Sequence, residues 1–313
     1  MATQASKESG NKIDYFDMLP EGCLADTLAH TTPTDACRLA LVAPAFRSIA
    51  DSNGVWERFL PCDYSQLISR AVPAHRHILD HLALSPKKKL YLFLCDNPLV
   101  IDNGTLSFSL DKWTGKKCFM IAARELAIVW GDTPRYWRWT FDKESRFGKA
   151  IELISVCWLE IHGRINTSLL SPDTDYTAYL VYKPSIAVYG FEHQPVEIWI
   201  GLSGEECVKC TFILDPEGGL QANYVRMPPP RRLSLLHSNR ANQPRPQVPI
   251  PVGIETRCPR VRKDGWLEID LAQYFHKEGE NRELEITMME TKGGHWKSGL
   301  IIQGIEIRAK SGN

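Results

Sequence analysis

The chain has 313 residues, which at the usual ~150 residues per domain corresponds to about two domains, each large enough to bury its own core. It is 43% hydrophobic and 24% charged, and this composition excludes a wholly disordered, collagen-like or coiled-coil protein. The 37 basic residues balance the 37 acidic ones, so no net charge draws the whole chain to nucleic acid or to an anionic membrane.

The chain start and the apolar runs indicate where the protein resides. No apolar run approaches the ~20 residues that span a bilayer, and residues 1–12 lack the apolar core of a secretory signal. We therefore expect a location in the nucleus and cytoplasm and no membrane partner. In that compartment the nine scattered cysteines are expected to be reduced and mostly buried.

Helical periodicity dominates the first third of the chain. Pro20 can occupy a first helical turn, and Leu24 and Leu28 repeat at i, i+4, so residues 21–29 are predicted to form a short amphipathic helix. A second helix is predicted to begin with Thr34 as its N-cap, and Pro44 to start a third. Residues 12–62 thus form a predicted helical module, and residues 63–97 a helical linker.

From Pro98 onward the pattern alternates with a period of two. Leu267, Ile269 and Leu271, for example, alternate with acidic residues, as in a strand that buries one face. No helix of crossover length separates the strands, which disfavours a parallel sheet. The predicted fold is therefore α+β, an all-α module followed over residues 98–309 by an antiparallel β-sandwich of the jelly-roll type. The predicted strands are 106–113, 116–123, 126–130, 150–163, 175–182, 195–202, 208–214, 266–271, 283–290 and 299–309.

One stretch, residues 226–263, departs from this pattern. It holds 8 of the 20 prolines and nine basic residues against one acidic residue, Glu255. Because proline removes the hydrogen-bond donors of a sheet, we predict a long basic loop inserted between strands. A solvated loop and a nuclear targeting patch are both open, whereas nucleic-acid contact lacks the interleaved aromatic residues that would favour it.

The helical module resembles an F-box. The matching residues are Leu19-Pro20-Glu21, Asp35-Ala36-Cys37, Val42, Phe46, residues 55–61 and Asp63-Tyr64. This resemblance implies docking on the Skp-type adaptor of an SCF-type cullin ubiquitin ligase. The expected adaptor contacts are Leu19, Pro20, Leu24, Leu28, Val55 and Trp56. The alternative is that this apolar face packs within the protein and that Trp56 belongs purely to the core.

The β region resembles the phloem protein 2-like lectin domain, of which the tobacco lectin Nictaba is the best-known member. The matches are residues 110–139, 150–172, 265–269 and 295–308. The resemblance implies a carbohydrate-binding jelly roll, with preferences among members for N-acetylglucosamine oligomers, N-glycan cores or galactose-containing glycans. It aligns the binding tryptophans with Trp130 and Trp137, and the binding carboxylates with Glu283 and Glu290.

These residue types suit a sugar, because its C–H face stacks on an indole while its hydroxyls need directed acceptors. Glu283 and Glu290 are an odd number apart, so they face one ligand only if their strand ends or bulges between them. Four further tryptophans are expected to pack inside the protein, namely Trp158, Trp199, Trp266 and Trp296.

Other chemistry finds little support in the sequence. Two carboxylates also occur in glycosidases, but no second motif indicates catalysis, so we predict a non-catalytic protein. Cys207 and Cys210 form a lone CxxC without the further ligands of a zinc site, and the histidines at 75, 77 and 81 are expected to be solvated, so no metal or cofactor is predicted. The predicted function is a glycan-reading substrate receptor of a ubiquitin ligase, and the alternative is a lectin-like domain that binds protein or peptide without sugar.

Overall fold

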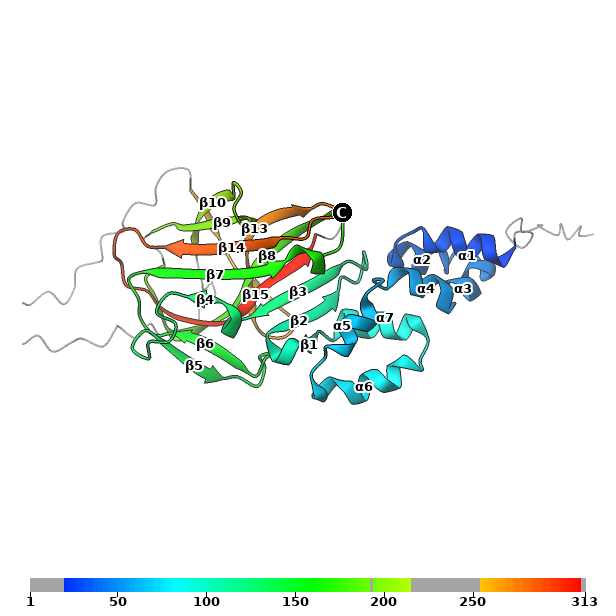
Figure 1. Ribbon diagram of the computed structural model, residues 1–313, viewed down its shortest axis with the longest axis horizontal. Coiled ribbons are helices and arrows are strands. Elements are labelled where there is room, and N and C mark those ends of the chain that lie inside the picture. Colours follow the sequence, from blue (N-terminus) through cyan, green and yellow to red (C-terminus); the bar gives the residue numbers. More distant parts are fainter. Residues whose placement is uncertain (1–19, 192–193, 215–253, 311–313) are drawn as a thin grey trace, which may run out of the picture.

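A computed structural model describes residues 20–191, 194–214 and 254–310 (Figure 1). A run of helices precedes a largely antiparallel β-sandwich, which confirms the predicted α+β fold. Within the described residues, no helix is both long and apolar enough to cross a membrane. The helices are α1 (Glu21–Ala29), α2 (Pro33–Leu39), α3 (Pro44–Ala50), α4 (Asn53–Phe59), α5 (Tyr64–Ser69), α6 (Pro73–Ala83) and α7 (Lys87–Asp96).

The start of α2 differs from the prediction. Its N-cap is Thr32, whose side-chain oxygen accepts from the backbone N–H of Asp35 at 3.1 Å. Pro33 forms the first turn, where its missing N–H needs no partner. The predicted cap at Thr34 is therefore wrong, because Pro33 is the first residue of this helix and not part of the segment that precedes it.

The strands form two sheets. They are β1 (Leu99–Ile101), β2 (Leu106–Leu110), β3 (Lys117–Ala122), β4 (Ala127–Ile128), β5 (Trp137–Phe141), β6 (Lys149–Leu153), β7 (Leu159–Asn166), β8 (Thr174–Tyr189), β9 (Val196–Leu202), β10 (Val208–Leu214), β11 (Glu255–Arg257), β12 (Arg260–Val261), β13 (Leu267–His276), β14 (Glu283–Glu290) and β15 (Ser298–Ala309). Short 3₁₀ turns lie at Asp102–Gly104, Ala123–Glu125 and Thr167–Leu169.

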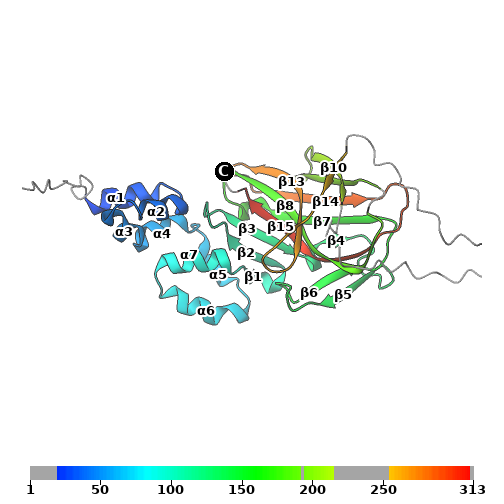
Figure 2. The ribbon, with the colours of Figure 1, turned by 180° about the vertical axis from the view of Figure 1, so that it is seen from behind.

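The nine-stranded sheet has the order β1-β2-β3-β15-β8-β13-β12, with β6 and then β5 added beside β15. The six-stranded sheet has the order β11-β10-β9-β14-β7-β4. Every pairing between these strands is antiparallel except that of β10 with β11. The facing sides share one core, which includes Ile161 and Ile286 from one sheet and Leu180 and Ile305 from the other. Figures 1 and 2 show this sandwich from opposite sides.

The predicted basic loop is wrong at its C-terminal end. Residues 255–257 pair with β10 in parallel, and residues 260–261 pair with β13. Pro259 lies between these two short strands, so it removes no ladder donor from either. The part of this predicted loop from 226 to 253 lies outside the described residues.

The helices and the sandwich share a continuous apolar core. Tyr91 of α7 is fully buried, its ring lies 5.1 Å from that of Trp56, and its hydroxyl lies 3.1 Å from the backbone oxygen of Asp111. Lys117 of β3 pairs with Asp63 at 3.0 Å. Figures 1 and 2 show α5 and α7 beside β1 and β2. The two predicted cores are therefore joined.

Candidate functional site

Residues 129–139, which comprise the β4–β5 loop and the first residues of β5 and are called the tryptophan loop here, present aromatic side chains at one edge of the sandwich. The loop begins directly after β4 with Val129, whose N–H donates to the backbone oxygen of Glu160 at 3.1 Å. Trp130 then adopts φ +58°, a left-handed conformation that is rare for a bulky residue. Its indole is 44% exposed and lies 5.3 Å from the ring of Tyr136. Backbone strain of this kind concentrates at functional sites, and in this loop it holds an indole in solvent.

Trp137 occupies a different environment. It is only 2% exposed, and its Nε1 donates to the backbone oxygen of Val129 at 3.2 Å. One side of it nevertheless borders a cavity of about 310 Å³, whose other lining residues are Gly131, Asp132, Pro134, Arg138 and Trp139. An exposed indole, a carboxylate and a guanidinium thus surround one cavity, and these are groups that bind a hydroxyl-rich ligand.

The two predicted carboxylates do not join this loop. Strand β14 runs without interruption from Glu283 to Glu290, so seven steps of ~3.4 Å separate them by about 24 Å. Glu290 faces the core and forms an ion pair with the buried Lys297. Burial lowers the pKa of the Lys297 ammonium. Glu283 is exposed near Arg164 at the opposite end of the strand.

The predicted four-residue sugar site is therefore corrected. Trp130 and Trp137 both belong to the tryptophan loop. Glu283 lies at the far end of β14 from Glu290, and Glu290 is buried inside the sandwich in its ion pair with Lys297. The alternation of side chains along a strand requires this outcome, since neither an end nor a bulge separates the two glutamates.

Asp132 was not predicted, although its place in a turn between tryptophans is a usable signal. Trp158 and Trp296 were predicted to pack inside, whereas they are 43% and 48% exposed. Trp266 is fully buried as expected, and Trp199 is partly buried.

The expected adaptor contacts are mostly core residues. Leu24, Leu28, Val55 and Trp56 are buried, and Trp56 Nε1 donates to the backbone oxygen of Ala50 at 2.5 Å. Their burial favours the alternative that this apolar face packs within the protein, because helices this short need these side chains for their own core. Pro20 is exposed, and Leu19 lies outside the described residues.

Two other apolar side chains of the helical module face solvent. Leu41 and Val42, in the turn between α2 and α3, are 80% and 70% exposed. Together they form a small exposed apolar patch that nothing in the described part of the chain covers.

The cysteines are less buried than the sequence predicted. All nine cysteines are free, and only Cys118 is fully buried, so the expectation of mostly buried thiols is wrong. Burial raises the pKa of the Cys210 thiol, which donates to the backbone oxygen of Leu271. Among the described residues, no group of three or more histidine, cysteine or acidic side chains could hold a metal ion.

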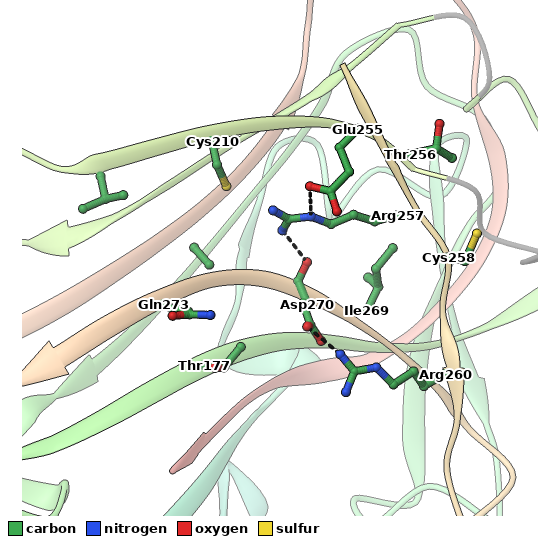
Figure 3. Close-up of a pocket in the computed structure, with 12 residues that line it drawn as sticks. Thr177, Cys210, Glu255, Thr256, Arg257, Cys258, Arg260, Ile269, Asp270 and Gln273 are labelled. Atoms are coloured by element: carbon green, nitrogen blue, oxygen red, sulfur yellow. Dashed lines mark hydrogen bonds and ion pairs between the residues drawn. The ribbon is translucent and has the colours of Figure 1, made fainter. Parts of the chain in front are cut away.

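A second cavity, of about 430 Å³, lies where β10 and β11 face β8 and β13 (Figure 3). Arg257 spans it and donates to the backbone oxygens of Asp270 and Leu271 at 3.0 and 2.9 Å. Arg260 pairs with the Asp270 carboxylate at 2.7 Å. Because these charged groups bind one another and tie the two sheets together, the tryptophan loop is the stronger candidate site.

Comparison with known proteins identifies both parts of the chain. Residues 116–309 match the phloem protein 2 family. F-box protein PP2-B10 of Arabidopsis thaliana is 40% identical over 295 residues, covering 94% of this chain and 93% of the relative. F-box protein PP2-B1 of the same plant is 37% identical over 322 residues, covering 97% and 93%. The chain therefore belongs to the phloem protein 2 family and, within it, to the plant F-box proteins that carry this domain.

Among solved structures, the CBM22-1 xylan-binding domain of Paenibacillus barcinonensis Xyn10C aligns with 62% of this chain and 87% of that chain. The sequence identity is 8% and the TM-score is 0.26, a likeness too weak to carry an argument.

Proposed function

We propose that this protein is a non-catalytic substrate receptor of an SCF-type ubiquitin ligase, which recognises glycans or glycoproteins through its β-sandwich. The observation that carries the proposal is the similarity to F-box proteins over nearly the whole chain, helices and sandwich together. An F-box docks on a Skp-type adaptor, so the helical module would join the ligase while the sandwich selects the target.

The exposed turn between α2 and α3 supports the adaptor half. Leu41 and Val42 are large apolar side chains that no other part of the protein covers within the described residues. Burying both in an interface would remove them from water, which is the main favourable term in protein association.

The tryptophan loop supports the glycan half. It combines the exposed Trp130, the cavity bordered by Trp137 and the carboxylate of Asp132. Lectin sites need both an aromatic face and a directed acceptor, and the loop supplies the two within ten residues.

Co-expression with a Skp-type adaptor tests the first half. Replacing both exposed side chains, Leu41→Asp with Val42→Asp, is expected to abolish co-purification without changing the melting temperature. Leu84→Asp is the matched control, because Leu84 is 93% exposed at the end of α6 and should leave co-purification intact. Failure of the wild-type chain to bind the adaptor would contradict the F-box proposal.

A glycan panel containing N-acetylglucosamine oligomers, N-glycan cores and galactosides tests the second half. The wild-type protein should bind at least one member, and Trp130→Ala should weaken that binding. If the chain binds the adaptor but no glycan, the sandwich selects its targets as protein or peptide without sugar.

A further inference from the structure

Four side chains form a hydrogen-bonded row on the outer face of the six-stranded sheet: Trp158 just before β7, Glu160 and His162 on β7, and Thr287 on β14. Trp158 Nε1 donates to Glu160 Oε2 at 2.6 Å, and His162 Nε2 lies 2.9 Å from Glu160 Oε1. His162 Nδ1 lies 2.9 Å from Thr287 Oγ1. An ionised carboxylate only accepts, so Nε2 donates to Glu160, and the Thr287 hydroxyl holds the ring at Nδ1. The row therefore holds Glu160 in one orientation.

Strand pairing places this row beside the tryptophan loop. Ala127 and Ile128 of β4 lie opposite His162 and Ile161 of β7, and the N–H of Val129 donates to the Glu160 backbone oxygen. Trp130 is the next residue of the loop. Both Trp130 and Trp158 thus stand at the end of the β4–β7 pair where Glu160 lies.

The row is open to solvent on one side only. Leu159 and Ile161 point into the core, so alternation directs Glu160 and His162 outward. The indole of Trp158 is 43% exposed, and the side chain of Glu160 is 21% exposed. Each carboxylate oxygen of Glu160 has one donor already and can accept a second. Thr287 is only 7% exposed, so its hydroxyl holds the imidazole and reaches no ligand.

We propose that Trp158 and Glu160 extend the tryptophan loop into a carbohydrate platform on this outer face. Glu160 would supply the acceptor that the resemblance assigned to Glu283 and Glu290. A pyranose ring stacks on Trp158 while its hydroxyls donate to Glu160, and the adjacent Trp130 receives a second ring. The ligand class is therefore an oligosaccharide of at least two sugars. This inference rests on the proposed glycan recognition.

The test uses the purified full-length chain and the glycan panel described above. The panel member that binds the wild-type protein most strongly is titrated calorimetrically against Trp158→Ala and Glu160→Gln. Each variant is expected to raise the dissociation constant about tenfold or more, because each removes a contact made directly to the sugar. The melting temperature of Trp158→Ala should stay close to that of the wild type, since the indole is exposed.

Two matched controls carry the same substitutions elsewhere. Glu283→Gln changes an exposed carboxylate at the far end of the same sheet, and Trp113→Ala removes an indole that is 56% exposed in the β2–β3 turn. Both should bind within about twofold of the wild type.

The outcomes separate this inference from the proposed function. Loss of binding in the Trp158 and Glu160 variants, with normal binding by the controls, supports the platform. If those two variants bind normally while Trp130→Ala does not, the glycan proposal stands and the platform is overturned. If the wild-type protein binds no glycan, both are overturned.

Discussion

Trp130 and Trp137 are seven residues apart and have opposite environments. The backbone of Trp130 is left-handed and its ring faces solvent, whereas Trp137 is the first residue of β5 and its ring packs against the core. The resemblance treated the two alike. Trp137 therefore stabilises the fold, whereas the ring of Trp130 is accessible to a ligand.

This difference predicts distinct losses on truncation. Trp137→Ala should reduce the free energy of unfolding by about 3–5 kcal/mol, because it leaves a cavity and an unpaired backbone oxygen at Val129. Trp130→Ala should change it by less than about 1 kcal/mol. Urea denaturation of both variants measures these values, and equal losses would contradict the assignment.

The carboxylates show what the sequence could and could not predict about the site. The alternation rule indicated that Glu283 and Glu290 face opposite sides of a regular strand, and the uninterrupted β14 agrees with it. The Glu160 row was not predictable, because His162 and Thr287 are 125 residues apart in sequence and meet only through the pairing of β7 with β14. Sequence spacing carries no information on such a pairing.

At the scale of elements, the outer face of the nine-stranded sheet holds a buried charge network. Glu306 lies 2.7 Å from Arg146 and 2.6 Å from Arg262, and Arg308 pairs with the neighbouring Glu268. Burial alone would raise the pKa of the Glu306 carboxyl, but the three arginines outweigh burial and lower it to about 2. The network therefore stabilises the ionised form.

The lowered pKa predicts an acid-sensitive fold. The ordinary pKa of 4.5 applies in the unfolded chain, so Glu306 contributes its full stabilisation above about pH 4.5 and loses it as the pH falls toward 2. The shift corresponds to about 3 kcal/mol at most. Melting temperatures between pH 7 and pH 3 should fall steeply for the wild type and less steeply for Glu306→Gln.

The control for this pH series is Glu278→Gln, which changes an exposed glutamate on the turn after β13. It should follow the wild-type curve. Glu306→Gln should also start lower at neutral pH, because it leaves buried guanidinium groups without their charged partner. Parallel curves for all three proteins would contradict the role of Glu306.

Long alternating segments and the short edge strands differed in how well the sequence predicted them. β14 was predictable over its whole length, and β13 only as far as Leu271, because buried apolar residues recur at every second position in these stretches. A bulge between Asp270 and Ala272 interrupts the alternation in the rest of β13. β11 and β12 contain mostly polar residues beside proline and are strands only because β10 and β13 offer backbone partners. Edge strands of this kind follow from tertiary pairing and leave no periodic signal.

At the scale of the whole molecule, the change from helix to strand near residue 98 was predictable, but the continuity of the core was not. The chain length favoured two separate cores, whereas Tyr91 links Trp56 of the helices to the turn after β2. No local pattern around Tyr91 reports a contact with Asp111, since the pair is brought together by folding. The helical part and the sandwich thus meet through α7 and the turn after β2.

This continuity predicts that the helices and the sandwich unfold together. Cys95 of α7 and Cys118 of β3 provide one reporter in each part, and burial raises the pKa of both thiols to about 12, so both react slowly in the folded protein. Increasing urea should expose both to thiol labelling at the same midpoint, read by mass spectrometry of the labelled peptides. Tyr91→Ala should lower both midpoints equally, since the cavity destabilises the shared core by about 3–5 kcal/mol. Labelling of Cys95 at a clearly lower urea concentration than Cys118 would show two independent cores, and the exposed Leu84→Ala variant should leave both midpoints unchanged.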